Sequence, residues 1–201
     1  MRVTRPLDDL FDNPNNVKLL RHLSRYPSPV ITGRGLAREL GMSHATCIRA
    51  LDRLVYAGIV DRKRVGSGYT YEVATSSVIY QQAIKPAFDV EAELLSGLID
   101  ALLKGVRRRV HSAYLFGSVA RREDTPSSDV DVLVLTSNAE EKKAVTKATE
   151  SNREGVYRLY RVGVTAIVYD LEEFNRKRRR KDPLVSEVLK EGILVAGRGA
   201  V

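Results

Sequence analysis

The sequence predicts an α+β protein in two parts, residues 1–75 and 108–201, joined by a helical connector over residues 76–107. The first part has short segments of helical apolar spacing that lead into an alternating hairpin. The connector carries an apolar stripe at helical spacing. The last part alternates apolar runs of strand character with helical segments, which is typical of a mixed α/β domain.

Composition favours a globular protein with polyanionic partners. The chain has 201 residues, 43% of them hydrophobic, and 33 Lys+Arg against 25 Asp+Glu give a net charge of +8. This excess favours nucleic acid or nucleotide phosphates as ligands. One cysteine, Cys47, and three histidines argue against a disulfide framework and against a Cys- or His-based metal cluster.

The chain shows no signal for a membrane. No apolar run approaches the ~18 residues that a membrane span needs. The first residues, MRVTRPLDDLFDNP, contain no apolar stretch of the kind found in signal peptides. We therefore expect a cytoplasmic protein without membrane contact.

Capping residues mark three helices in the first part. Asn13 or Asn16 can cap the first helix, Thr32 caps a second over residues 33–40, and Ser43 caps a third that reaches about residue 57. A strand candidate over residues 59–64 and an alternating return strand over residues 69–73 follow, with a glycine-rich turn between them.

The stretch LARELGMSHATCIRALDRLVYAGIVDRKRVGSGYTYEV resembles a winged helix-turn-helix domain, and the resemblance covers about residues 14–75. It implies binding to double-stranded DNA, with a recognition helix in the major groove. If Cys47, Leu51 and Leu54 face inward, the polar side chains of the third helix face outward. The candidate base-reading residues are His44, Thr46, Arg49 and Arg53, and the candidate phosphate-binding residues of the wing are Arg62, Lys63 and Arg64. The alternative is a set of ordinary solvated charges on a domain used for protein contacts.

The connector stripe has two interpretations. Apolar residues recur between residues 90 and 103, at Leu94, Leu95, Leu98, Ile99, Leu102 and Leu103. The stripe fits a helix packed on the second domain and equally a homodimer contact, since winged-helix readers of palindromic DNA need two copies.

An Asp-x-Asp pair marks the chemistry of the second domain. Asp129 and Asp131 alternate with valines in a strand-like run, so period 2 puts both carboxylates on one face. Two such anions are tolerated when a divalent cation lies between them, and hard oxygen ligands suit Mg²⁺. Upstream, Gly117 allows a close backbone approach to a ligand, and Ser118 offers an amide and a hydroxyl for phosphate oxygens.

The stretch GSVARREDTPSSDVDVLV resembles the signature of the DNA polymerase β-type nucleotidyltransferases, in particular their minimal branch. The resemblance covers about residues 108–197 and departs at Arg122, where glycine is usual. It implies that Gly117, Ser118 and Arg121 bind a nucleoside triphosphate and that the catalytic residues Asp129 and Asp131 bind Mg²⁺. The implied reaction is an in-line attack of a hydroxyl on the α-phosphorus.

The third carboxylate of that family falls on Thr165, a poor base and a weak metal ligand. Asp170 has the opposite strand parity and reads as a helix N-cap together with Glu173. Glu150, Glu154 or a partner's residue could take the base role.

Two functions therefore stay open. In the first, a DNA-binding protein binds Mg-NTP and could transfer a nucleoside monophosphate to a hydroxyl acceptor. In the second, a transcriptional regulator or antitoxin-like partner-binding protein has a degenerate domain that senses nucleotide or binds a protein partner. Association with a protein partner is implied by the resemblance to the minimal branch.

A run of six basic residues, RKRRRK at residues 176–181, precedes Asp182 and Pro183. It fits a solvated helix end, whose cations suit the C-terminal dipole. It also fits a polyanion contact, either to DNA flanking the winged-helix site or to an RNA acceptor.

Overall fold

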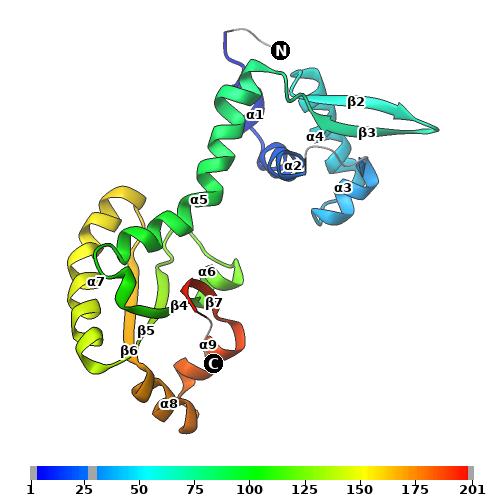
Figure 1. Ribbon diagram of the computed structural model, residues 1–201. Coiled ribbons are helices and arrows are strands. Elements are labelled where there is room, and N and C mark those ends of the chain that lie inside the picture. The colour runs from blue at the N-terminus through cyan, green and yellow to red at the C-terminus, as the bar shows by residue number, and fades with distance from the viewer. Residues whose placement is uncertain (1–3, 27–30, 199–201) are drawn as a thin grey trace. The chain divides into compact units, whose positions relative to one another are not determined.

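The computed structural model describes residues 4–26 and 31–198. The chain divides into two compact units, Met1–Ala92 and Glu93–Val201, and the division lies inside the predicted connector. Each unit has its own hydrophobic core, and Figure 1 shows the helices and strands that make up each unit. Within the described residues, no helix has both the length and the apolar character needed to cross a bilayer.

Helices of the first unit begin where the capping residues predict. Asn13, rather than Asn16, accepts a hydrogen bond from the Asn15 amide, while Thr32 and Ser43 cap the next two long helices. A preceding one-turn helix was not expected, because four residues carry no readable period. The helices are α1 (Asp8–Phe11), α2 (Pro14–Arg25), α3 (Gly33–Glu39) and α4 (His44–Tyr56).

A small antiparallel sheet completes the first unit. β2 (Val60–Val65) and β3 (Gly68–Val73) form the predicted hairpin, and Gly66 in its turn has φ +59°. β1 (Ile31–Thr32) pairs with the other edge of β3 and was not predicted, because two residues show no alternation. The order of helix, helix, helix and hairpin is that of a winged helix-turn-helix domain (Figure 1).

The core of this unit fixes which face of α4 is free. Cys47, Leu51 and Leu54 are all buried, as predicted, and pack with leucines of α2 and α3. Tyr80 and Ile84, from a single π-helical turn that precedes α5, also enter this core. The opposite face of α4 is left to its polar residues.

Helix α5 (Lys85–Leu102) crosses the division between the units. Pro86 lies in its first turn and does not interrupt it, since the first turn of a helix tolerates proline. The second half of the apolar stripe packs into the core of the second unit, through Leu98, Ile99, Leu102 and Leu103. Val90 and Leu94 stay exposed, so a homodimer contact through residues 90–103 would rest on them and remains a prediction.

The second unit is built on the predicted mixed sheet. Its strand order is β6-β5-β4-β7, with β5 and β6 parallel and the other pairs antiparallel. The strands are β4 (Val110–Phe116), β5 (Val130–Thr136), β6 (Val164–Asp170) and β7 (Ile193–Gly197). A short 3₁₀ turn, Arg107–Arg109, leads into β4, and the short helix α6 (Gly117–Arg121) follows it.

The two faces of this sheet have different covers. Valines of β5 pack with α5 and with α7 (Ala139–Tyr160) on one face. On the other face, Leu133 and Leu135 pack with α8 (Leu171–Arg179) and α9 (Pro183–Glu191). Asp131 has the parity of Leu133, so its side chain leaves the sheet on the face that carries α8 and α9.

Candidate functional site

The two aspartates lie where three strands meet. Asp131 in β5 is the register partner of Phe116, the last residue of β4, and of Thr165 in β6. Asp129 stands directly before β5, where the neighbouring Val130 amide donates to the Gly163 carbonyl at 2.9 Å. Asp129 is exposed and Asp131 is half-buried. The strand register thus brings the Asp-x-Asp pair beside the end of β4, where Gly117 and Ser118 begin α6.

Two glycines make room for the two carboxylates. Gly117 has φ +74°, and a Cβ on it would lie 2.8 Å from Oδ2 of Asp131. A Cβ on Gly163 would overlap the carboxylate of Asp129. The sequence singled out Gly117 for a close approach to a ligand and not for this contact with Asp131. Gly163 was missed, because nothing in the sequence near it marks a contact with Asp129.

The site concentrates negative charge. Burial raises the pKa of Asp131 above the ordinary carboxyl value, and the negative charges of Asp129 and of Glu187 on α9 raise it further. A cation between these groups would offset the repulsion. Glu187 was not singled out from the sequence. Its spacing of four from Glu191, which puts both on one face of α9, was the available signal.

Arg121 is held by three carboxylates in the structure. Its Nε donates to Glu123 at 2.9 Å, and its Nη1 lies 2.5 Å from Glu191 and 3.3 Å from Glu187. The carboxylates of Glu123 and Glu191 raise the pKa of the guanidinium, which stays charged. A triphosphate that used Arg121 would have to compete with these two α9 glutamates.

The structure offers no acid in the position of the missing carboxylate. Thr165 pairs with Asp131, and Asp170 is the N-cap of α8, with its carboxylate accepting from the Glu173 amide at 2.7 Å. Glu150 and Glu154 lie on α7, which covers the opposite face of the sheet, so neither is placed to act as the base. Among the described residues, no three His, Cys, Asp or Glu side chains gather closely enough to hold a metal ion by themselves.

In the first unit, the predicted outer face of α4 is polar and largely exposed. His44, Arg49 and Arg53 are exposed, whereas Thr46 is half-buried and its hydroxyl lies 2.9 Å from that of Ser43. Thr46 is thus partly used in capping α4.

Ion pairs divide the predicted DNA-binding cations into two classes. Arg53 lies 3.7 Å from Asp12, Arg62 lies 3.3 Å from Asp52, and Lys63 pairs with Glu72. Arg49 and Arg64 form no ion pair within the described part of the chain. Arg49 and Arg64 are therefore the side chains best placed to bind phosphates or base edges, because only water would have to leave them.

The Asp52–Arg62 ion pair ties α4 to the wing. Arg49 lies one turn before Asp52 on α4, and Arg64 lies two residues after Arg62 on the same face of β2. The guanidinium of Arg62 also lies over the Tyr69 ring, 4.8 Å from its centroid. Arg34 and Arg38, exposed on α3 and one turn apart, are further cations that the sequence reading did not single out.

A family model described as polymerase beta, nucleotidyltransferase, matches residues 99–199. The chain belongs to this nucleotidyltransferase family. The MarR family model matches residues 13–68, which contain α2 to α4, β2 and the turn of the wing. The predicted fusion of a winged helix-turn-helix domain with a nucleotidyltransferase domain is thereby confirmed.

The similarity of this chain to solved structures is limited to part of its length. Three solved structures each cover 51% of this chain. They are a toxin–antitoxin with AMP-PNP (18% identity, TM-score 0.35, 73% of that chain), a mutant of the toxin–antitoxin MntA-HpeT (16%, 0.34, 73%) and a putative nucleotidyltransferase from Sulfolobus solfataricus (20%, 0.29, 76%). A search of curated proteins finds no match.

Within the nucleotidyltransferase domain, the backbone explains the one departure from the motif. Arg122 ends α6 in the left-handed region, with φ 60° and ψ 36°. Glycine adopts this conformation without cost, which is why glycine suits the position. Arg122 adopts the same left-handed turn, at a steric cost that glycine would not have.

The donor set of this nucleotidyltransferase domain fits a hard divalent cation. Asp129 and Asp131 supply carboxylate oxygens, and their mutual repulsion falls when a cation binds. Mg²⁺ is commonly held by one or two carboxylates together with substrate phosphates. Asp129 and Asp131 match that pattern of two protein carboxylates, while β6 carries Thr165 in place of a third.

Proposed function

We propose that this chain is a DNA-binding regulator whose nucleotidyltransferase domain binds Mg-NTP and does not turn it over efficiently. One observation carries the proposal: Asp131 faces Thr165 across the β5–β6 register, where a third carboxylate would stand. The two aspartates supply cation binding, and the threonine supplies neither a charged ligand nor a base.

Each group of the site has a defined role in this proposal. Asp129 and Asp131 hold the cation, which neutralises the triphosphate when bound. Gly117 and Ser118 approach the phosphates through the backbone of the β4–α6 turn. Arg121 leaves Glu187 and Glu191 to bind a phosphate, so that nucleotide binding would loosen the contact between α6 and α9. That local change is the signal that a nucleotide sensor requires.

In this proposal the winged helix-turn-helix domain binds DNA, and nucleotide binding at the second domain regulates that binding. Arg49 and His44 read base edges from α4, and Arg64 contacts phosphate beside the groove. The MarR family match supports this assignment, as do the exposure of Arg49 and Arg64 and their lack of an ion pair with any residue that the structure describes.

A titration paired with a transfer assay tests the proposal. Isothermal titration with ATP should give binding with Mg²⁺ and much weaker binding with EDTA, and Asp129→Asn should lose the Mg²⁺ dependence. With α-labelled NTP, the wild type should form little or no labelled product. Failure to bind any of the four NTPs with Mg²⁺ would overturn the proposal.

Transfer to a hydroxyl acceptor is the second candidate. Glu187 lies close enough to raise the pKa of Asp131, so α9 brings a third carboxylate to this side of the sheet. Release of Glu187 from Arg121 would free it to take a proton from an attacking hydroxyl. Strong labelled transfer by the wild type that Glu187→Gln abolishes would favour this candidate over the first.

A further inference from the structure

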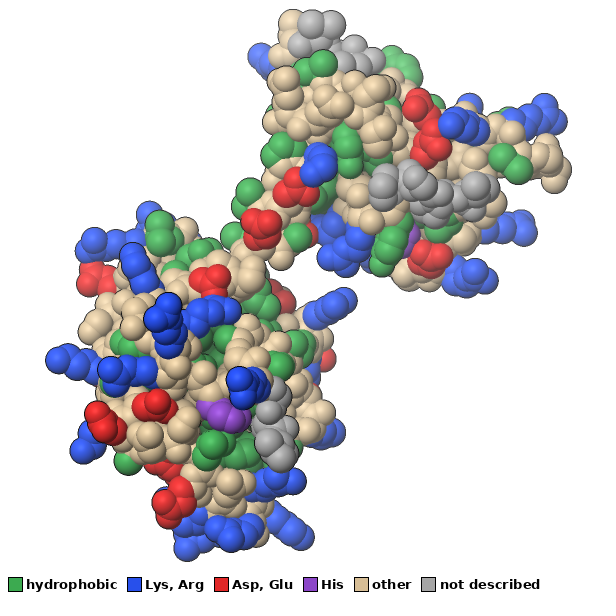
Figure 2. All heavy atoms as spheres, in the orientation of Figure 1, with side chains coloured by type: hydrophobic (Ala, Val, Ile, Leu, Met, Phe, Trp, Pro, Cys, Tyr) green, Lys and Arg blue, Asp and Glu red, His purple; other side chains and the backbone are tan. Residues whose placement is uncertain are grey.

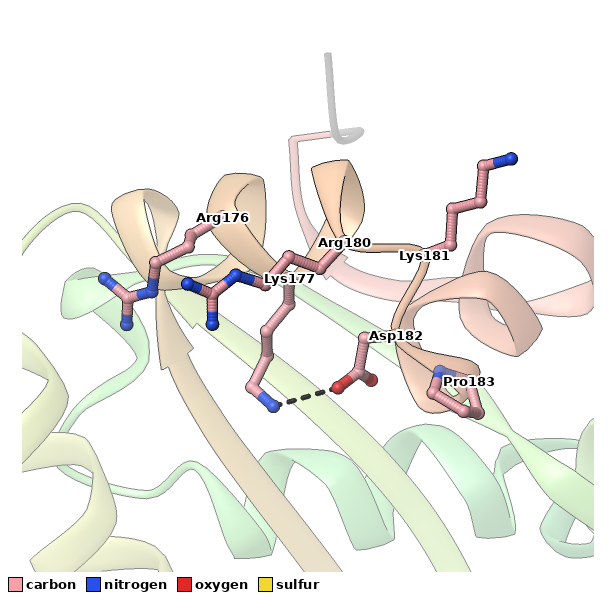
Figure 3. A pocket seen from close by; sticks show the side chains of 6 residues that line it. All are labelled: Arg176, Lys177, Arg180, Lys181, Asp182 and Pro183. Atoms are coloured by element: carbon pink, nitrogen blue, oxygen red, sulfur yellow. Dashed lines mark hydrogen bonds and ion pairs between the residues drawn. The ribbon is translucent and has the colours of Figure 1, made fainter.

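The corner between α8 and α9 is a cationic cavity outside the nucleotidyltransferase site. It has a volume of about 410 Å³ and is lined by Arg176, Lys177, Arg180, Lys181, Asp182 and Pro183 (Figure 3). Lys177 lies over the ring of Tyr169, and Tyr169 is four residues beyond Thr165 along β6, so the corner lies toward the end of that strand away from the Asp-x-Asp pair. The corner is therefore not part of the nucleotide site.

The corner carries more positive charges than negative ones. Lys177 donates to Asp182 at 3.0 Å and lies 5.1 Å from the Tyr169 ring centroid, so one cation has its counter-ion. Arg176, Arg180 and Lys181 are exposed and form no ion pair with any described residue. Figure 3 shows the side chains of Arg176 and Arg180 extending in the same direction from α8. Two neighbouring guanidinium groups that have no ion-pair partner among the described residues repel each other and offer donors to an anion.

The needs of the helix do not account for these charges. Cations near a helix C-terminus gain only a small stabilisation each from the dipole, and only within the last turn. Backbone amides already bond carbonyls of the last turn of α8: the Lys181 amide donates to the Arg178 carbonyl, and the Asp182 amide donates to the Lys177 carbonyl. Lys181 itself has φ 53°, a conformation at which glycine is the usual residue. A cation therefore occupies a strained backbone position that glycine would fit better.

The form of the corner indicates an extended polyanion. On the adjoining surface of α8, Arg178 and Arg179 line a second hollow with Glu172 and Asn175, so the cations continue around the helix. Figure 2 shows Lys and Arg side chains gathered at the end of the unit where Figure 1 places α8. A small anion binds best in an enclosed pocket with a few converging donors, whereas spaced cations match the repeated charges of a phosphodiester backbone.

We propose that the α8–α9 corner binds the phosphodiester backbone of nucleic acid, through Arg176 and Arg180 with Lys181 at the flank. The contact is independent of sequence and adds to that of the winged helix. It does not depend on nucleotide binding at the Asp-x-Asp pair, so the two proposals fail separately.

The test measures the salt dependence of binding by the full chain. The probes are duplex DNA of arbitrary sequence and poly(U) RNA. Arg176→Ala/Arg180→Ala should reduce the slope of log K against log salt by about two for the polymer that uses the corner. The control, Arg153→Ala/Arg158→Ala, removes two exposed arginines of α7, of which Arg158 pairs with Glu154, and should leave the slope unchanged. Arg176→Lys/Arg180→Lys should restore most of the binding.

The polymer whose salt slope changes in the Arg176→Ala/Arg180→Ala variant identifies the nucleic acid that the corner binds. A smaller slope with DNA alone would show that the corner adds a contact to DNA beside the winged-helix site. A smaller slope with RNA alone would show that it binds RNA. Lys181→Gly separates binding from folding, because glycine should raise the Tm of the second unit while it weakens binding. Unchanged slopes with both polymers, or no binding of the wild type to either at low salt, would overturn the proposal.

Discussion

Asp131 on β5 and Thr165 on β6 are direct register partners in parallel strands, so both side chains leave the sheet on the same face. The register therefore confirms that Thr165 stands beside the Asp-x-Asp pair. A carboxylate at residue 165 would be adjacent to both aspartates, whereas one at residue 170 would be on the opposite face and five residues farther along.

Thr165→Asp should tighten Mg²⁺ binding by at least tenfold, because it adds a third carboxylate to the pair. Without metal the variant should melt at a lower temperature than the wild type, since three carboxylates repel. Mg²⁺ should then raise its Tm by more than it raises that of the wild type. Thr165→Asn is the control of similar shape without the charge, and equal Mg²⁺ affinities for both variants would contradict this account.

Asp131 should make the second unit less stable as pH rises. Its pKa in the fold is raised by burial and by its acidic neighbours, so between the ordinary carboxyl pKa and the raised value the folded state binds more protons than the unfolded state. The free energy of unfolding therefore falls as pH increases through that window. At neutral pH without divalent cations, Asp131→Asn should melt above the wild type. A higher wild-type Tm under these conditions would contradict the assigned repulsion.

Gly163→Ala should weaken metal binding without touching a carboxylate. The new Cβ overlaps the Asp129 carboxylate and must displace it, while the backbone at Gly163 is not in the left-handed region. We expect the Kd for Mg²⁺ to rise by about tenfold, which is about 1.4 kcal/mol. Gly155→Ala on α7 is the matched control, because a Cβ there meets nothing within 4 Å. Equal Mg²⁺ affinities in the two variants would show that Asp129 does not depend on Gly163.

Arg122→Gly should stabilise the second unit by about 1 kcal/mol, since glycine adopts the left-handed conformation of this residue without steric cost. Arg122→Ala keeps the strain and should give no such gain. Thermal unfolding of the two variants, followed at one pH, measures the difference. If Arg122→Ala raised the stability as much as Arg122→Gly, the loss of the arginine charge would explain the effect, and relief of backbone strain would not.

DNA binding should separate Arg49 from Arg64. Arg49→Ala should cost about 1–3 kcal/mol on the preferred site and relax sequence preference, because α4 reads base edges. Arg64→Ala should weaken binding to all sequences alike and reduce the salt slope by about one. Lys63→Ala, which removes a cation already paired with Glu72, is the control for charge. Equal losses on all sequences from both arginine variants would show that Arg49 does not read bases.

The fold was largely readable because its signals are local. Thr32, Ser43 and Asp170 act as the predicted caps, and the alternation of Asp129 to Val134 predicted the strand that the structure has as β5, whereas its parallel pairing with β6 was not predicted. The contacts of the site were not readable, because they join distant segments. Gly163 meets Asp129 only through the β5–β6 pairing, and the α9 glutamates meet Arg121 only after α9 returns along β4.

The most direct test of the central claim is a crystal structure of the full chain with Mg²⁺ and a nonhydrolysable NTP. The account predicts metal density on Asp129 and Asp131 that bridges to phosphate oxygens, with Thr165 as the nearest side chain on β6 and no carboxylate beside the α-phosphate. Triphosphate density near Arg121, with Glu187 and Glu191 released, would agree with it. Nucleotide bound away from the aspartates, or a third carboxylate on the metal, would contradict it.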